Sequence, residues 1–384
     1  MNIRNLVPAL AIVTLTSTVG FAADAAPAVT FSGWVDTVLQ FSDDDTKNSA
    51  VTGKDEAAGS LRFTGLASLK AAWKVTDKVS VKANLWFDPG TNAVNLREAY
   101  FTWAFNDSLS WTMGKYIDHI GWISTEPTGP NFLFVNCDTI GYREIYGNDV
   151  LGTALNIAPK DSPISGAIHI TNGYFTKSDA TSTNYSSPNS GTRENSDLGF
   201  GLDLTFKLPN ELGSINAELA YDIHSGSTAY LGGPIPAATG LGGDVLLVGI
   251  NATIKPVKIV TLGAELQYLT VGESESATGV KANNGIDRLQ FLLLGNVAIE
   301  AAPVPMSVTG LVQFVSIDHD LPALTEKEDR LYVGVALLTN PVTNSNFGLN
   351  FDVGYFDKTG INGVAGAAGE NNGVTVAVEG LLSF

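Results

Sequence analysis

Hydrophobic and polar residues alternate one by one along most of this chain, and that period of two is typical of β-strands rather than helices. In the segment 197–208, for example, every even position from Leu198 onward is apolar, while Asp203 and Lys207 stand between them. The same rhythm recurs in segment after segment. We therefore predict sixteen strands, at residues 29–41, 60–74, 79–87, 95–105, 109–117, 150–158, 164–171, 197–208, 214–223, 244–254, 259–268, 287–300, 306–316, 330–339, 347–355 and 373–384.

The connections between these segments fall into two classes that alternate along the chain. One class is short and holds turn-forming residues, as in 75–78 and 209–213. The other is mostly long and polar, and its longest member is 118–149. An antiparallel meander with short turns at one end and long loops at the other gives this layout. The prediction is an all-β, antiparallel up-and-down barrel that spans a membrane, with both ends of the meander on the short-turn side.

A soluble sandwich or propeller would show similar alternation, because one strand face would pack on a core. The aromatic residues favour the membrane. They cluster near both ends of the apolar strand face, around a band of Val, Leu, Ala and Gly. Membrane barrels have aromatic residues enriched in this way at the two interfaces of the bilayer. The short-turn end has Trp73, Trp103, Phe105, Trp111, Phe206, Phe347 and Phe384, and the long-loop end has Phe41, Phe63, Phe87, Phe200, Tyr221, Tyr268, Phe291, Phe314 and Tyr355.

The first 22 residues read as a secretory signal peptide. Arg4 supplies the positive charge, an apolar run follows at 6–19, and 20–22 (Gly-Phe-Ala) is a small-x-small cleavage site. An uncleaved anchor is the alternative. The barrel then occupies 23–384. No later run of eighteen apolar residues predicts a transmembrane helix.

Charge and cysteine content exclude several classes of protein. The net charge of −17 leaves no basic patch to neutralise phosphates, so nucleic acid is not an expected partner. Cys137 is the only cysteine, which excludes a disulfide-stapled secreted scaffold. No cofactor motif or Cys/His metal spacing is present. The acidic surplus lies largely in the loops, which predicts only a mild cation preference. Alternatively, the loop acids keep the outer surface solvated or bind divalent ions between lipid headgroups.

A sixteen-stranded barrel is wide enough for a water-filled channel, so its inner strand face should be polar. The residues that we expect to line the pore wall are Arg62, Lys70, Lys82, Glu98, Glu218, Asp222, Glu265, Arg288 and Arg330. Some apolar positions break this rule: Leu246, Val248, Ile250, Leu292 and Leu294 fall on the predicted wet face. Either an inserted loop packs there, or the predicted register is off by one residue.

The loop 118–149 is too apolar to extend into water. We expect it to fold into the channel and narrow it, so that charged loop residues oppose charged wall residues and set selectivity. The alternatives are a loop packed on a neighbouring subunit and a loop with a small core of its own. The constriction residues predicted by the inward model are Glu126, Asp138, Arg143 and Glu144.

Two stretches carry a family resemblance. LREAYFTWAF at 96–105 and MGKYIDHIG at 113–121, with the loop up to Gly152, resemble the OmpL-like β-barrel porins of Gram-negative bacteria. The chain departs from that pattern at 148–152, where the proline expected before the last glycine is absent. The resemblance implies an outer-membrane porin, a diffusion channel for small hydrophilic solutes and ions, and names no solute.

Two other functions compete with the pore. The loops could serve surface binding or adhesion. A barrel hydrolase would need a nucleophile and base, yet the chain has four histidines and no nucleophile elbow or zinc motif, so an enzyme is not expected. The expected partners are membrane lipid and lipopolysaccharide, small solutes, two further copies in a homotrimer, and the barrel-assembly machinery. That machinery would read the terminal Phe384.

Overall fold

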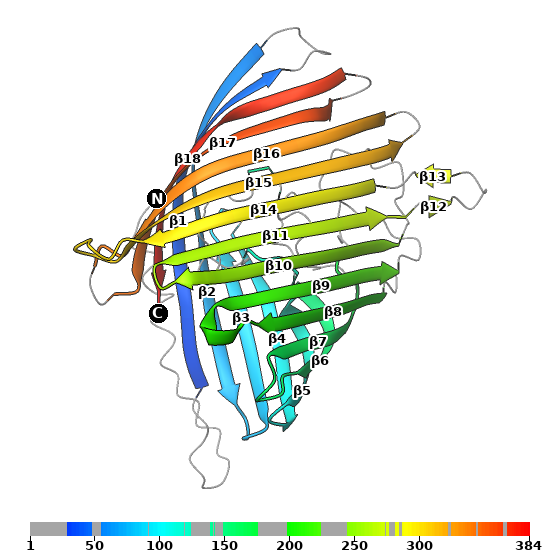
Figure 1. The fold of residues 1–384 in the computed structure, drawn as a ribbon, viewed down its shortest axis with the longest axis vertical. Coiled ribbons are helices and arrows are strands. Elements are labelled where there is room, and N and C mark those ends of the chain that lie inside the picture. The colour runs from blue at the N-terminus through cyan, green and yellow to red at the C-terminus, as the bar shows by residue number, and fades with distance from the viewer. Residues whose placement is uncertain are drawn as a thin grey trace.

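The computed structural model describes residues 29–47, 55–90, 92–118, 120–123, 139–140, 142, 149–175, 198–223, 244–272, 274–275, 281–283, 286–321, 324–342, 345–363 and 367–384. Sixteen antiparallel strands close into one barrel, in which each strand pairs with its neighbours in the meander and β1 pairs with β18 (Figure 1). The wall strands are β1 (Val29–Lys47), β2 (Asp55–Lys74), β3 (Val79–Asp88), β4 (Ala93–Asn106), β5 (Leu109–Ile117), β6 (Asp149–Ile157), β7 (Ile164–Thr171), β8 (Leu198–Lys207), β9 (Gly213–Ile223), β10 (Val245–Val257), β11 (Val260–Val271), β14 (Ile286–Ala298), β15 (Met306–Leu321), β16 (Leu324–Thr339), β17 (Phe347–Gly363) and β18 (Ala367–Ser383).

The predicted fold class is confirmed, and so is the number of strands. Each wall strand overlaps one predicted segment, and the strands beside the seam extend further: β1 continues to Lys47 and β2 begins at Asp55. A separate small sheet of β12 (Ser274–Glu275) and β13 (Lys281–Asn283) lies in the connection between β11 and β14 (Figure 1). One short 3-10 turn, η3 (Pro209–Glu211), joins β8 to β9. Among the described residues, no helix is long and apolar enough to cross a membrane.

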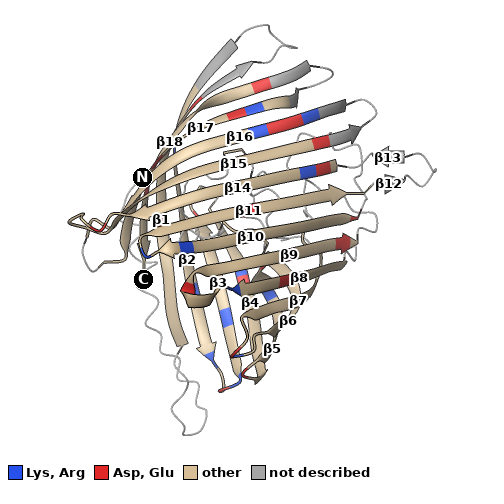
Figure 2. Cartoon of the chain, in the orientation of Figure 1, with Lys and Arg blue, Asp and Glu red and all other residues tan. Residues whose placement is uncertain are grey.

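The outward face of the wall is apolar. On β8, for example, the apolar side chains from Leu198 to Phe206 are exposed, while Gly199 and Gly201 between them are buried on the inner side. Aromatic residues predicted for the two girdles are exposed at both strand ends, including Trp73, Trp103, Tyr268 and Tyr355. The charged positions of β14, β15 and β16 gather at one end of these strands, as Figure 2 shows. An exposed apolar band with aromatic edges is what a bilayer would cover.

The barrel closes where its first and last strands meet. The register runs from Trp34 opposite Ser383 to Lys47 opposite Glu370. Phe384 extends the seam, because its backbone N–H donates to Gly33 O over 3.0 Å and its carbonyl accepts from Gly33 N over 2.9 Å. No wall strand is left with an unpaired edge at this seam, and that is a requirement for a sheet in lipid.

The predicted register of the tenth strand was off by one residue. Val248 and Ile250 point outward and are 45% and 49% exposed, while Val245 and Leu247 point inward and are buried. On β14, by contrast, Leu292 and Leu294 do face inward as predicted, and both are buried on the inner side of the wall. Apolar side chains therefore do line part of the interior.

Candidate functional site: the inner wall and the inward segments

The chain turns into the barrel directly after β5. The turn begins at Asp118. Its Oδ1 accepts a hydrogen bond of 3.0 Å from the backbone N–H of Ile120, and this bond stabilises the turn. Gly121 follows with a φ of 94°, a left-handed conformation that suits glycine and is unfavourable for residues with a Cβ. The sequence Asp-His-Ile-Gly thus supplies the local chemistry for a reversal at this point.

The first inward limb, residues 120–123, is hydrogen-bonded to acidic side chains of the facing wall. The N–H of Gly121 donates to Glu218 Oε2 of β9 over 2.9 Å, and the N–H of Trp122 donates to Glu265 Oε1 of β11 over 2.6 Å. The indole Nε1 of Trp122 donates to Thr253 Oγ1 of β10 over 2.8 Å. Charge-assisted bonds of this kind are stronger than neutral ones, so these carboxylates act as anchors.

The second limb, residues 139–140 and 142, is held by arginine side chains and by the same glutamate. Arg330 of β16 donates to the carbonyl of Ile140 over 2.9 Å, and Arg288 of β14 donates to the carbonyl of Tyr142 over 3.4 Å. The Tyr142 hydroxyl donates to Glu265 Oε2 over 3.0 Å. Glu265 therefore joins both limbs, one to each carboxylate oxygen.

A third segment folds inward after β7. The backbone N–H of Tyr174 donates to both carboxylate oxygens of Asp222, over 2.9 and 2.7 Å, and the N–H of Phe175 donates to Oδ2 over 2.8 Å. Asp222 lies on β9 and is fully buried. Burial raises the pKa of the Tyr174 phenol, with nearby carboxylates adding to the effect, so its hydroxyl stays neutral.

Apolar side chains of these segments pack against the inner wall. Ile120, Trp122, Ile140 and Tyr142 belong to one buried hydrophobic cluster. Most wall residues of the same cluster lie on β10 to β16, namely Val245, Leu247, Leu269, Val271, Ile286, Leu292, Leu294, Leu311, Val315, Ile317, Tyr332 and Ala336. The others are Tyr116 of β5, Val150 and Ala154 of β6, Ala220 of β9 and Phe356 of β17. The inward apolar residues of β10 to β16 thus serve as a packing surface for the inward segments.

Polar side chains continue the network along that wall. Gln267 Nε2 donates to Glu218 Oε1 over 2.6 Å, Gln290 Nε2 donates to Gln267 Oε1 over 2.6 Å, and Arg288 Nε donates to Gln290 Oε1 over 3.0 Å. All four residues are at most 5% exposed. These four side chains thereby obtain partners, which offsets the cost of burying them.

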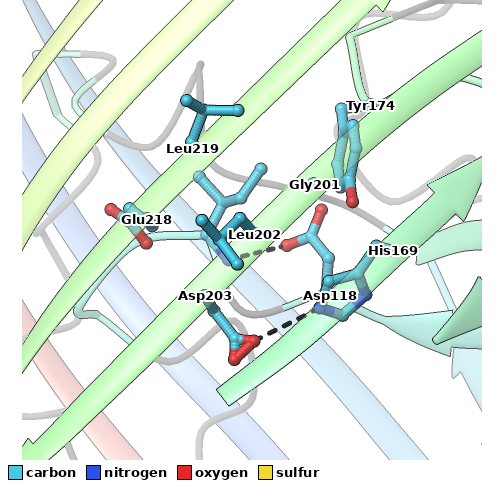
Figure 3. Close-up of a pocket in the computed structure, with 9 residues that line it drawn as sticks. Asp118, His169, Tyr174, Gly201, Leu202, Asp203, Glu218 and Leu219 are labelled. Atoms are coloured by element: carbon cyan, nitrogen blue, oxygen red, sulfur yellow. Dashed lines mark hydrogen bonds and ion pairs between the residues drawn. The ribbon is translucent and has the colours of Figure 1, made fainter. Parts of the chain in front are cut away.

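A small pocket lies where the first and third inward segments meet the wall (Figure 3). His169 of β7 contacts Asp203 of β8 across 3.3 Å (Nε2 to Oδ1) and the Tyr116 hydroxyl of β5 across 3.2 Å (Nδ1 to OH). The labelled carboxylates of Asp118 and Glu218 belong to the same lining (Figure 3). Sequence reasoning missed this cluster, because residues on three strands meet only once the register is known.

The remaining predicted wall residues lie on the opposite side, on β2, β3 and β4. Lys82 Nζ donates to Glu98 Oε1 over 2.9 Å, and Glu98 is buried while Lys82 is 34% exposed. Arg62 Nε donates to Gln40 Oε1 over 2.7 Å at an exposed position. Lys70 is half-buried on the same inner face. Figure 2 shows Lys and Arg positions on β3 and β4, behind the front wall. The three basic residues predicted for this wall thus keep part of their surface exposed, whereas Glu98 is buried.

The predicted site residues therefore divide into groups. Glu218, Asp222, Glu265, Arg288 and Arg330 lie beneath inward segments and hold their backbone, whereas Arg62, Lys70, Lys82 and Glu98 lie on the other wall. The four predicted constriction residues, Glu126, Asp138, Arg143 and Glu144, fall outside the described residues, as does the predicted signal peptide at 1–22. In the part of the chain that the structure describes, no group of three His, Cys, Asp or Glu side chains is arranged to hold a metal.

No protein-family model matches the sequence, and no curated protein is similar to it in sequence. Solved structures are similar in fold. The outer-membrane channel DcaP of Acinetobacter baumannii has a TM-score of 0.59 at 14% identity, covering 95% of this chain and 99% of that one. This chain and that channel therefore share a β-barrel fold. An anion-selective porin from Comamonas acidovorans gives 0.54 at 13% identity, covering 93% and 99%. OmpT of Vibrio cholerae in a trimer form gives 0.51 at 12%, covering 92% and 99%.

These likenesses show the fold. They agree with the closed sixteen-stranded barrel, and the resemblance to the OmpL-like porins stays a prediction. The constriction role of the long loop stays a prediction too, although its described limbs contact the inner wall.

Proposed function

We propose that this chain is an outer-membrane porin that forms a water-filled channel for passive diffusion of small hydrophilic solutes and ions. The observation that carries the proposal is a closed sixteen-stranded wall with an apolar outer face and charged residues on its inner face. A barrel of this size is too wide for wall side chains to fill, so a channel remains unless loops occupy it. The inward segments described above pack mostly against β9 to β16, and polar groups such as Arg62 stay exposed on the β2–β4 side.

The finer parts of the proposal concern selectivity and partners. The net charge of −17 supports a mild cation preference, whereas the described basic groups on β2 and β3 act against it. The partners that we propose are membrane lipid and lipopolysaccharide at the outer face, the barrel-assembly machinery, and two further copies in a homotrimer. The similar Vibrio cholerae protein has a trimer form. An unheated gel of the purified protein tests the trimer, which would migrate near three times the chain mass.

Planar-bilayer recording tests the pore directly. Purified, folded protein is expected to give stable conductance steps, and vesicles that contain it should swell in small sugars. A salt gradient then gives the reversal potential, whose sign reports the ion preference. Folded and inserted protein that passes neither ions nor sugars would refute the proposal.

Surface binding by the long loops is the second candidate function. It rests on the length and polarity of those loops, and it predicts an inserted barrel without conductance. A barrel hydrolase is the third. The buried contact between His169 and Asp203 is the nearest approach to a catalytic pair among the described residues, and it has Tyr116 on its other side rather than a serine. Incubation with ester and peptide substrates, with His169→Ala as the control, would reveal such an activity.

A further inference from the structure

Trp122 is bound to the inner wall at two points. Its side chain is 4% exposed, and its backbone N–H and its indole N–H each donate to a different wall strand, to Glu265 of β11 and Thr253 of β10. Tyr142 of the second limb is held in a similar way, by its carbonyl to Arg288 of β14 and by its hydroxyl to Glu265 of β11. Because of its two bonds, Trp122 has little freedom to shift along the wall.

The surface beneath the indole is made by two residues that face each other across the β10–β11 pair. Thr253 lies directly opposite Gly263 in the register. A Cβ built on Gly263 would lie 2.5 Å from Cη2 of Trp122 and closer still to Cζ2. Real Cβ atoms do not approach other atoms so closely, so the missing side chain of Gly263 provides the space that the six-membered ring fills.

The neighbouring wall residue connects this point to the second limb. Glu265 lies two residues after Gly263 on the same face of β11, and it accepts from Trp122 N–H and from the Tyr142 hydroxyl. A displacement of Trp122 from the wall would therefore strain the bond that Glu265 makes to the other limb. The position of both limbs depends on how closely Trp122 approaches the wall.

We propose that Thr253 and Gly263 form a docking slot for Trp122, and that this slot sets how far the inward limbs project into the channel. Thr253, Gly263 and Glu265 are positioning residues, because they act on permeation through Trp122 and Tyr142. This inference rests on the proposed porin function and adds the residues that determine its pore width.

The test is the single-channel conductance of Gly263→Ala in a planar bilayer. The new methyl group takes the place of the ring, so the limb moves toward the lumen and the unit conductance falls. Gly310→Ala is the matched control, because a Cβ at that β15 glycine meets nothing within 4 Å, and its conductance should equal that of the wild type.

A second substitution separates displacement from general damage. Trp122→Phe lacks the two ring atoms that the methyl group would meet, so the double variant Gly263→Ala with Trp122→Phe should recover conductance that Gly263→Ala loses. A non-additive pair of this kind is the signature of two residues in contact. A merely structural defect would instead persist or worsen in the double variant.

Each outcome is informative. Folded Gly263→Ala with wild-type conductance, or a double variant with no recovery, overturns the slot. If Gly263→Ala fails to fold, Thr253→Val removes only the indole partner, and wild-type conductance and open-channel noise in that variant would overturn the slot as well. Wild-type protein that inserts and does not conduct would refute the porin proposal itself, which is a different result.

Discussion

At the scale of single residues, charge inside this barrel has two separate uses. Some wall carboxylates and guanidinium groups are buried and bind the backbone of inward segments, as Glu265 and Arg330 do. Others, such as Lys82, keep part of their surface exposed to the lumen. Only the second kind can contact a passing ion directly, because the first kind is buried beneath the inward segments. Counting charges on the inner face therefore overstates how many govern selectivity.

Glu265→Ala should destabilise the barrel strongly. It removes the acceptor of two hydrogen bonds and leaves the Trp122 N–H and the Tyr142 hydroxyl buried, which costs about 2 to 5 kcal/mol. Urea unfolding in lipid vesicles, followed by tryptophan fluorescence, measures the change. Glu300→Ala is the matched control, because Glu300 is 65% exposed in a 3.8 Å pair with Lys258, and its loss should cost at most about 0.5 kcal/mol. Equal destabilisation by the two substitutions would contradict the anchoring role.

Lys82→Gln should shift the reversal potential in a salt gradient toward stronger cation preference. The substitution removes a partly exposed positive charge from the inner wall and leaves Glu98 without its cationic partner. Lys258→Gln provides the comparison, because Lys258 is 93% exposed on the turn after β10, away from the inner wall. A shift of the same size in both variants would mean that selectivity follows net charge alone.

At the scale of secondary-structure elements, each wall strand has one face toward lipid and the other toward the lumen. The period of two places apolar residues toward lipid and the rest toward the lumen, and a one-residue slip would exchange the faces. The β8 strand shows this division, with Leu202 outward and Asp203 on the inner side. On β10 both faces carry apolar residues, because its inner face is covered by the inward segments.

A charged residue on the outward face of β8 should be much less tolerated than one on its inner face. Leu202→Arg places a charge in the apolar band and should cost about 2 to 4 kcal/mol. Thr205→Arg on the same strand faces the lumen and should change stability little. The measurement is the urea midpoint of each variant in vesicles. If Thr205→Arg proved the more damaging of the two, the assignment of the faces would be reversed.

Strands could be predicted from the sequence because alternation is local, and residues two apart share a face whatever the rest of the chain does. The error on β10 has the same origin, since Val245 and Leu247 are as apolar as Val248 and Ile250, and alternation gives no sign of which pair faces lipid. The anchoring of the inward limbs could not be predicted.

Trp122 and Glu265 are 143 residues apart, and their meeting depends on the shear of the whole barrel. The apolarity of the segment 118–149 did indicate that it needs burial, and its described limbs are buried. Nothing in the sequence around Gly263 distinguishes it from other strand glycines, because its role lies in the ring that covers it. Local patterns thus predict elements, and contacts between distant elements decide the site.

At the scale of the whole molecule, a β-sheet can span a membrane only if it closes into a barrel. Every backbone N–H and C=O in the lipid region needs a partner, so an open barrel would expose two unpaired edges. The seam between β1 and β18 removes both of these edges. Phe384 lies at its end, where its backbone makes two hydrogen bonds to Gly33 and the residue is 60% exposed.

The seam hydrogen bonds of Phe384 and the predicted signal in its ring can be tested separately. Deleting the residue removes both backbone bonds to Gly33 and the aromatic ring, whereas Phe384→Ala keeps the backbone and removes only the ring. If the ring is the signal that the barrel-assembly machinery recognises, both variants should accumulate after export without inserting into the outer membrane, and Phe384→Tyr should insert normally. The amount of heat-modifiable, membrane-inserted protein measures the outcome. Normal insertion of Phe384→Ala together with failure of the deletion would instead assign the effect to the seam hydrogen bonds, because only the deletion breaks them.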